Sequence, residues 1–254
     1  MTINTGTSST PKPTRIYFFG TCLIDLFYPE AGLSAIELIE REGIKVHYPQ
    51  AQTCCGQPPY NSGYNKEAMA VAAKQINLFS DPIPIIVPSA SCAGMMKHHY
   101  PTLFRNHPMQ TKANELSSRV FELSEFLVKV LNISLDDQGP PVNVAMHISC
   151  SARREMNVAD DSLALLRKLK NVNVIEPERA NECCGFGGTF AVKQPEISAA
   201  MAEDKCQAIE RIGASKLVSQ DCGCLMNLNG VMEKTERNIQ GEHLASFIIN
   251  RTRT

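Results

Sequence analysis

The chemistry of this sequence lies chiefly in its ten cysteines. Thiolate sulfur is a soft ligand that binds zinc and iron-sulfur clusters, and it also takes part in redox chemistry. The cysteines stand at Cys22, Cys54, Cys55 and Cys92 in the first half, and at Cys150, Cys183, Cys184, Cys206, Cys222 and Cys224 in the second. With the exception of Cys206, they form two similar sets.

The spacing within the sets indicates an internal duplication. There are 31 residues between Cys22 and Cys54, and 32 between Cys150 and Cys183. A glycine follows each adjacent pair; 35 residues then precede Cys92 in the first half, and 38 precede Cys224 in the second. Two copies of so long a pattern are typical of a repeated domain.

The adjacent pairs favour a cluster over a single zinc ion. Zinc sites usually take two ligands from a short knuckle with two to four residues between the cysteines, and this chain lacks one. Sulfurs of an adjacent pair can reach different iron atoms of a larger core, and the glycine after each pair allows a tight turn. We therefore predict two metal sites. Their ligands are Cys22, Cys54, Cys55 and Cys92 in one, and Cys150, Cys183, Cys184 and Cys224 in the other, with Cys222 as an additional candidate.

Regular elements recur around both sets in the same order. Each first cysteine ends a β-type run, each pair lies in a loop, and each last cysteine follows a third strand. The predicted strand segments are 15–22, 45–48 and 83–92 in the first half, and 143–150, 172–175 and 216–224 in the second. Apolar periodicity predicts helices over 32–41, 66–79, 115–131, 162–169, 196–212 and 243–251. Proline and glycine within 136–141 indicate a linker.

This alternation predicts an α/β fold built from two duplicated domains. Each is expected to be a small parallel sheet flanked by helices in Rossmann-like layers. The expected boundaries are 14–141 and 142–254, preceded by a disordered polar segment over 1–13. Ligands of parallel sheets bind at the carboxyl ends of the strands, so each cysteine set is expected to converge there.

Composition narrows the classes of partner. Lys and Arg number 25 against 26 Asp and Glu, a net charge of -1, so nucleic acid is not an expected partner. No window reaches the roughly 18 consecutive apolar residues of a membrane span, and the start lacks the apolar core of a signal peptide. We expect a cytoplasmic location, where clustered thiols hold metals or do redox chemistry more often than they form disulfides.

Several motifs carry a resemblance to a known family. They are Cys54-Cys-Gly-Gln-Pro, Asn61-Ser-Gly-Tyr64, Glu182-Cys-Cys-Gly-Phe-Gly-Gly-Thr-Phe190 with Lys193, and Cys224-Leu-Met-Asn227. Together with the doubled cysteine pattern, they make the chain resemble the cysteine-rich CCG-domain proteins, and among these the lactate utilisation protein A family. The resemblance extends over nearly everything from Arg15 onward.

The resemblance implies an iron-sulfur electron-transfer component of a cytoplasmic complex that oxidises L-lactate to pyruvate. The chain would be a subunit of this oxidoreductase and would not turn over alone, and no residue is assigned a catalytic role. The implied cofactor is an iron-sulfur cluster, with 4Fe-4S the expected type, at one or two per chain. The implied partners are the B and C proteins of the lactate utilisation system, and lactate and pyruvate would be involved indirectly.

One departure from the wider family bears on the cluster. The cysteine-rich subunit of heterodisulfide reductase, a more distant relative, binds a noncubane cluster in each repeat through five cysteines that end in a C-x-x-C pair. In this chain Ser89 stands three residues before Cys92, and Asp221 stands three residues before Cys224. The fifth ligand of that pattern is therefore absent from both halves.

Two other classes of function remain open from the residues alone. One is a zinc-stabilised assembly scaffold with structural cysteines. The other is a thiol-disulfide redox protein that uses the Cys54-Cys55 and Cys183-Cys184 pairs. The metal content of the purified protein separates the three functions. Iron favours the electron-transfer component, zinc favours the scaffold, and metal-free protein favours the thiol-disulfide redox protein.

Four further side chains have ordinary structural explanations. Cys206 has no counterpart in the repeat and is expected to be a small buried hydrophobe. His147, three residues before Cys150, could hydrogen-bond a cluster sulfur, but we expect a neighbouring group to satisfy it. His98 and His99 are expected to face solvent on a helix after Cys92.

Overall fold

Two parallel sheets form the framework of the protein. The computed structural model describes residues 12–253, so the disorder expected for residues 1–13 concerns almost entirely residues outside that range. In the first sheet, β1 (Arg15–Phe18), β2 (Lys45–His47), β3 (Ile85–Val87) and β4 (Val120–Glu122) lie in the order β2-β1-β3-β4. In the second, β5 (Val142–His147), β6 (Val172–Ile175), β7 (Lys216–Ser219) and β8 (Gly241–His243) lie in the order β6-β5-β7-β8.

The shared strand order confirms the predicted α/β class and the duplication. Every neighbouring pair of strands is parallel. In this order the chain passes from one side of β1 to the other, so the point where the connections diverge lies between β1 and β3, and in the second sheet between β5 and β7. Ligands of doubly wound sheets bind at such a point.

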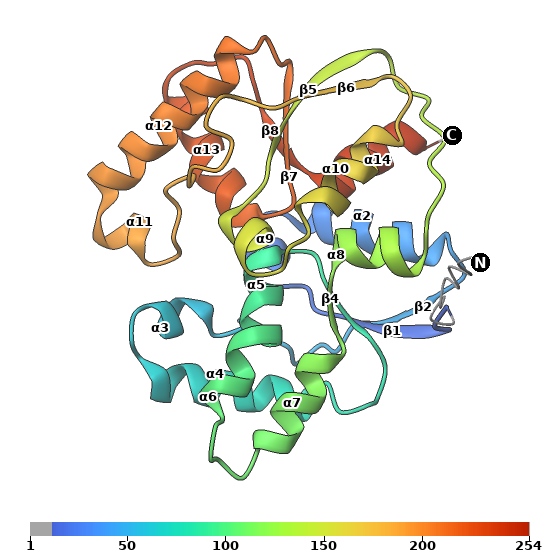
Figure 1. Ribbon diagram of the computed structural model, residues 1–254, viewed down its shortest axis with the longest axis vertical. Helices are drawn as coiled ribbons and strands as arrows, with labels where there is room; N and C mark the ends of the chain where they lie inside the picture. Colours follow the sequence, from blue (N-terminus) through green and yellow to red (C-terminus); the bar gives the residue numbers. More distant parts are fainter. Residues whose placement is uncertain (1–11, 254) are drawn as a thin grey trace, which may run out of the picture.

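Helices cover both sheets (Figure 1), and three of them begin at a cysteine, namely Cys22, Cys150 and Cys222. The first half contains α1 (Cys22–Phe27), α2 (Pro29–Glu40), α3 (Gln57–Asn61), α4 (Asn65–Leu78), α5 (Ala90–Gly94), the π-helical turn η1 (Met95–His99), α6 (Tyr100–Leu103), α7 (Gln110–Ser118), α8 (Leu123–Glu125) and the π-helical turn η2 (Phe126–Val130). The second contains α9 (Cys150–Arg154), α10 (Ala159–Arg167), α11 (Phe190–Lys193), α12 (Pro195–Arg211), α13 (Cys222–Lys234) and α14 (Leu244–Thr252).

The single helix predicted over 115–131 is wrong. That segment holds the end of α7, then β4, then α8 and η2. Its apolar residues suit either period, but β4 pairs with β3 in the register Ile85↔Val120. Arg119 stabilises the break before β4 by donating to the carbonyl oxygens of Phe79, Asp81 and Ile83. The strand β8 before α14 is a second element that periodicity did not reveal; like β4, it runs directly into the following helix, with no turn residue between them.

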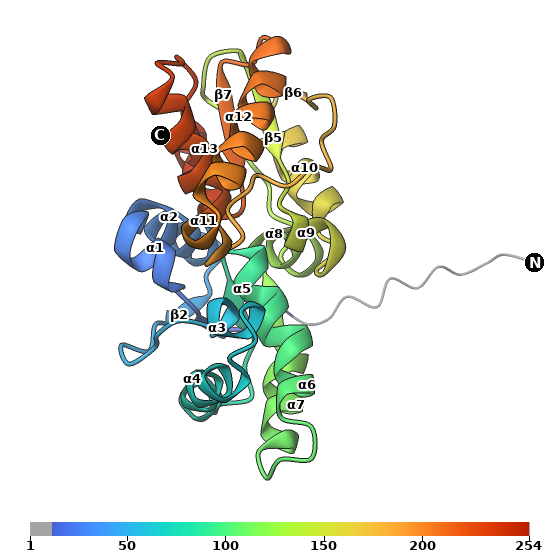
Figure 2. The same ribbon diagram turned by 90° about the vertical axis from the view of Figure 1, so that its left-hand side faces the viewer.

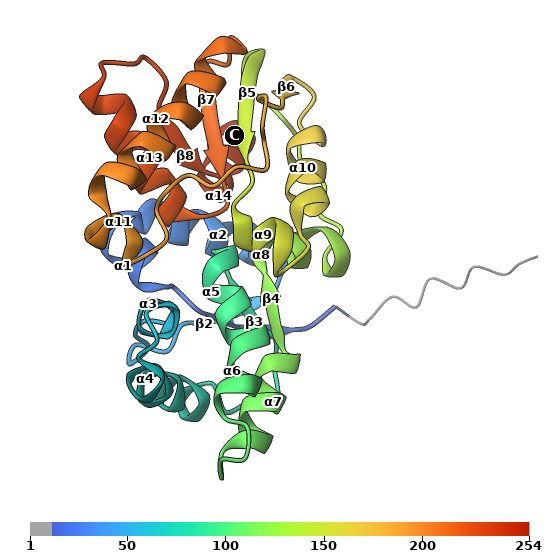
Figure 3. The same ribbon diagram turned by 60° about the vertical axis from the view of Figure 1, so that its left-hand side comes forward.

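The two halves pack against each other with approximate two-fold symmetry. Helix α2 packs on α14, and the equivalent helix α10 packs on α8 and η2. Likewise α1 packs on α13 (Figure 2), and α5 packs on α9 near the middle of the molecule (Figure 3). One apolar core runs through both halves, from Ile16 to Ile249. The predicted division into two domains, over residues 14–141 and 142–254, stays a prediction.

The linker joins the C-terminal helix through a buried ion pair. Residues 136–141 form no helix or strand, as predicted. Asp137 is paired with Arg251 of α14 at 2.9 Å, and the Asp137 side chain is inaccessible to solvent. Within residues 12–253, none of the helices has the length and apolar character to cross a membrane.

Candidate metal centre

The first cysteine set converges at the carboxyl end of the first sheet. Cys22 begins α1 directly after β1, the pair Cys54-Cys55 lies between β2 and α3, and Cys92 lies in α5 after β3. The Cys55 thiol donates to the Cys92 sulfur at 3.3 Å. Hydrogen bonds, from the Cys22 thiol first and then from Cys55, lower the pKa of Cys54 to about 3. The structure therefore favours one thiolate in this set, at the first cysteine of the pair.

The second set repeats this arrangement at the carboxyl end of the second sheet. Hydrogen bonds from Cys150 and Cys184 lower the pKa of Cys183 to about 2. Hydrogen bonding with Cys183 and then with Cys224 raises the pKa of Cys184, and the Cys184 and Cys224 sulfurs lie within 4.8 Å of each other. Cys184 and Cys224 are buried, whereas Cys150 is exposed at the rim. Each set predicted from spacing is thus brought together; service as metal ligands stays a prediction.

The glycine after each pair directs its own amide at the first sulfur. The Gly56 N–H donates to Cys54 Sγ, and the Gly185 N–H donates to Cys183 Sγ, both at 3.4 Å. Their φ angles are 87° and 84°, in the left-handed region that L residues rarely adopt. Hydrogen bonds from backbone amides to thiolates are a common means of stabilising charge at metal-sulfur sites. The need for glycine predicted at these positions is confirmed.

Polar side chains also hold the second cysteine of each pair. The Tyr100 hydroxyl donates to the Cys55 carbonyl at 2.8 Å, and Asn227 Nδ2 donates to the Cys184 carbonyl at 2.7 Å. Asn227 belongs to one of the family motifs, whereas Tyr100 had no sequence signal. Both contacts fix the peptide from which a buried sulfur projects.

Two motifs from opposite halves meet beside the second set. The Ser62 hydroxyl lies 2.7 Å from the Thr189 hydroxyl, and Lys193 Nζ lies 5.7 Å from the centre of the Tyr64 ring. All four residues belong to motifs that carried the family resemblance. Their spacing in the sequence gave no sign that they touch.

A cavity at the second set is lined by all four of its cysteines. Its walls also include residues of the first half, so the second site is completed by both halves; these residues are Gln57, Asn61 and Ser91. Cys22 and Cys54 line a separate cavity of about 230 Å³ at the first set. Four thiols, an N–H···S bond and an adjoining cavity make each set a fitting site for a soft metal or a metal-sulfur cluster.

The positions where the fifth cysteine is absent form a polar contact between the halves. The Asp221 carboxylate accepts from the Ser91 N–H at 3.0 Å and from the Gly223 N–H at 3.3 Å. Ser89 and Ser91 share a hydrogen bond of 3.1 Å between their hydroxyls. Asp221 is 4% exposed, and burial raises its pKa. The oxygen groups here thus connect the halves next to both cysteine sets.

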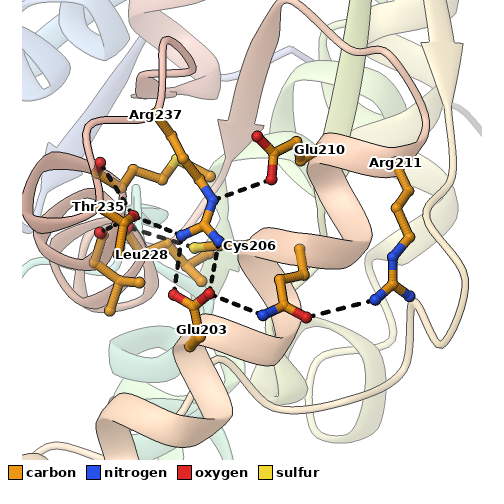
Figure 4. A network of polar contacts seen from close by, with 10 residues as sticks. Glu203, Cys206, Glu210, Arg211, Leu228, Thr235 and Arg237 are labelled. Carbon is orange, nitrogen blue, oxygen red and sulfur yellow. Dashed lines mark hydrogen bonds and ion pairs between the residues drawn. The ribbon is translucent and has the colours of Figure 1, made fainter.

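The two remaining cysteines lie outside these sulfur contacts. Cys222 is buried in a small apolar cluster with Ile24 and Ala31 of α1 and α2, and its predicted role as an additional ligand stays a prediction. Cys206 is fully buried in α12, with its Sγ 3.7 Å from the Leu228 carbonyl oxygen. It lies beneath a surface network in which Arg237 bonds Glu203 and Glu210 (Figure 4). The burial expected for Cys206 is confirmed.

His147 departs from expectation. It ends β5 with 3% exposure, yet neither ring nitrogen has a hydrogen-bond partner within residues 12–253. Burial first, and then the charge of Lys205, lowers its pKa to about 3, so the imidazole is neutral. The neighbour expected to satisfy it is absent from the described residues. His98 is exposed as expected, whereas His99 is half-buried and lies 3.8 Å from Glu155.

Comparison with known proteins identifies relatives of nearly the same length. The cysteine-rich domain family CCG matches residues 16–97 and 144–229. Lactate utilization protein A of Geobacillus thermodenitrificans (strain NG80-2) is 40% identical over 93% of this chain and 99% of its own. Lactate utilization protein A of Bacillus pumilus (strain SAFR-032) is 37% identical over 93% of this chain and 100% of its own.

A solved structure shares the fold at low sequence identity. A hypothetical protein from Helicobacter pylori superimposes with a TM-score of 0.66 and is 12% identical. The match covers 96% of this chain and 51% of that protein. At this identity the likeness shows a common architecture alone.

Proposed function

The chain belongs to the lactate utilization protein A family of CCG cysteine-rich-domain proteins, and on that basis we propose that it serves lactate utilisation as the iron-sulfur electron-transfer component of a cytoplasmic complex that oxidises L-lactate to pyruvate. The observation that carries the proposal is the doubled site. In each half, four cysteines at the carboxyl end of a parallel sheet meet around a sulfur that accepts a backbone N–H. A structural role for the cysteines leaves this repetition unexplained.

The chain's own residues would hold and shield the centres. Cys22, Cys54, Cys55 and Cys92 would bind one 4Fe-4S cluster, and Cys150, Cys183, Cys184 and Cys224 would bind a second. When bound, such a cluster accepts and releases electrons one at a time. Two cysteines in each set are buried, and these exclude water from the inner side; the other two lie nearer the surface, where a redox partner would approach.

Electron balance requires further components. Oxidation of lactate to pyruvate releases two electrons and two protons, so the complex also needs a group that takes both electrons from the substrate. We propose that the B and C proteins of the lactate utilisation system are the partners and that one of them binds lactate. This chain then supplies an electron path rather than a substrate site.

Growth on lactate tests this role. In a strain that lacks the native chain, the Cys183→Ser/Cys184→Ser double variant should fail to restore lactate-dependent growth, because a hydroxyl is a poor ligand for a soft metal. Cys206→Ala is the matched control, since it removes a buried thiol outside both sets. Circular dichroism must show both variants folded. If the double variant loses its metal and still restores growth on lactate, the result would instead favour the zinc-stabilised assembly scaffold.

A further inference from the structure

The second site contains a buried nitrogen donor that the first site lacks. His147 stands three residues before Cys150, and the equivalent position before Cys22 is Phe19, which is fully buried. The two positions match structurally, because each is followed by a hydroxyl residue that caps the helix beginning with the cysteine: Thr21 for α1 and Ser149 for α9. The two halves therefore place an imidazole and a phenyl ring at the same point.

The imidazole has hydrogen-bonding capacity that the described residues leave unused. A neutral imidazole carries one N–H donor and one lone-pair acceptor, and both nitrogens of His147 are buried without a partner in residues 12–253. Buried polar groups nearly always find partners, so such an exception needs an explanation. By contrast the other buried histidine, His243, bonds the Pro88 carbonyl and the Ala245 N–H.

The position of the unpaired ring suggests what its partner is. A ring nitrogen of His147 and the sulfurs of Cys184 and Cys224 all lie within 4.8 Å of one another. Ligands on one tetrahedral metal atom, at about 2.0 Å for nitrogen and about 2.3 Å for sulfur, lie roughly 3.5 Å apart. The three atoms thus lie close enough together to hold one metal centre.

We propose that His147 would be a nitrogen ligand of the second centre, beside Cys184 and Cys224. This inference rests on the proposed metal-holding role of the second cysteine set. Asp221, which occupies the place of a fifth cysteine, accepts hydrogen bonds from Ser91 and Gly223. His147 is therefore a candidate donor additional to the four cysteines of this set.

The proposal makes the two centres unequal. A neutral imidazole beside the four thiolates adds a nitrogen donor without adding negative charge, so the two centres would differ in their ligand sets. Only the second half contains such a donor, because Phe19 offers none.

Isotope labelling of histidine tests the ligand assignment directly. Full-length protein with ¹⁵N-histidine, purified anaerobically and reduced with dithionite, is examined by pulsed electron paramagnetic resonance. We expect a strong ¹⁵N hyperfine coupling typical of a metal-bound imidazole. It should be lost in His147→Phe, which copies the first half, and retained in His98→Phe, which changes an exposed histidine.

Two results of this experiment would overturn the assignment. Only a weak coupling in the unaltered protein would show a hydrogen bond in place of a ligand, and a strong coupling that survives His147→Phe would assign it to another residue. Metal analysis separates these results from failure of the proposed function. Protein that contains zinc refutes the iron-sulfur role but still tests His147, because Co²⁺ exchanged for zinc reports nitrogen ligation through the same coupling. Protein that binds neither metal refutes both.

Discussion

Substitution of alanine for Gly185, the glycine after the second cysteine pair, should destabilise the folded protein more than the same substitution at Gly56, the glycine after the first pair. Gly185 and Gly56 have nearly equal φ angles of 84° and 87°, so alanine at either costs about 1–2 kcal/mol of backbone strain. Their surroundings differ. A Cβ at Gly185 would lie 2.5 Å from the Ser198 carbonyl oxygen, whereas at Gly56 the nearest atom, the Ala68 carbonyl oxygen, would be 3.3 Å away.

The contact at Gly185 also endangers buried hydrogen bonds. Relief of a 2.5 Å contact with backbone requires the start of α12 to move, and Ser198 of that helix donates to the Gly185 carbonyl at 2.8 Å. A lost buried hydrogen bond costs about 1–3 kcal/mol. Gly185→Ala should therefore lose roughly 2–5 kcal/mol of unfolding free energy, and Gly56→Ala about 1–2 kcal/mol.

Urea denaturation followed by far-ultraviolet circular dichroism, under reducing conditions, measures both losses. Gly188→Ala is the matched control, because Gly188 has a φ of 62° and no atom within 4 Å of an added Cβ. It should show the strain alone and so resemble Gly56→Ala. Equal losses in Gly185→Ala and Gly188→Ala would refute the argument that the Ser198 contact makes glycine necessary at the second pair.

Two further predictions concern buried charge. Burial raises the pKa of Glu122 from 4.5 to about 7, so between these pH values the folded state keeps a proton that the unfolded state releases, and the free energy of unfolding should fall by about 3 kcal/mol as pH rises from 4.5 to 7. Urea titrations from pH 4 to 8 should show this fall in the native protein and not in Glu122→Gln. An equally steep fall in the variant would contradict the prediction. Arg251→Ala leaves Asp137 buried without its partner and should lower the free energy of unfolding by about 3–5 kcal/mol. The control is Arg253→Ala, which removes a solvent-exposed ion pair with Glu37 and should change the free energy of unfolding little. Similar losses in the two variants would show that the buried pair has no special role.

The convergence of the cysteines could be predicted from the sequence more completely than the packing between the helices. Cysteine spacing placed each sulfur after a particular strand, and parallel topology then required the sulfurs of one set to meet at the sheet edge. The strands β4 and β8 were missed because each runs directly into the helix that follows it, with no turn residue to mark the end of the strand. The packing of α2 on α14 depends on contacts between distant segments, which a single sequence does not encode locally.

His147 illustrates the same limit at a single residue. Its position before Cys150 indicated that it would lie near the sulfurs, but whether a neighbour satisfies a buried imidazole depends on every side chain around it. The unpartnered nitrogens became visible only in three dimensions. A histidine at one repeat and a phenylalanine at the equivalent place in the other is the sequence signal that would have singled it out.

The central claim is that the two cysteine sets hold iron-sulfur clusters, and the content of iron and acid-labile sulfide in anaerobically purified full-length protein tests it most directly. We expect brown protein with equal amounts of iron and sulfide, about four of each per occupied set. Cys54→Ser/Cys55→Ser and Cys183→Ser/Cys184→Ser should each lose the share of one set, whereas Cys206→Ala should lose none. Colourless protein with zinc and no sulfide, or metal-free protein with reactive thiols, would contradict the account.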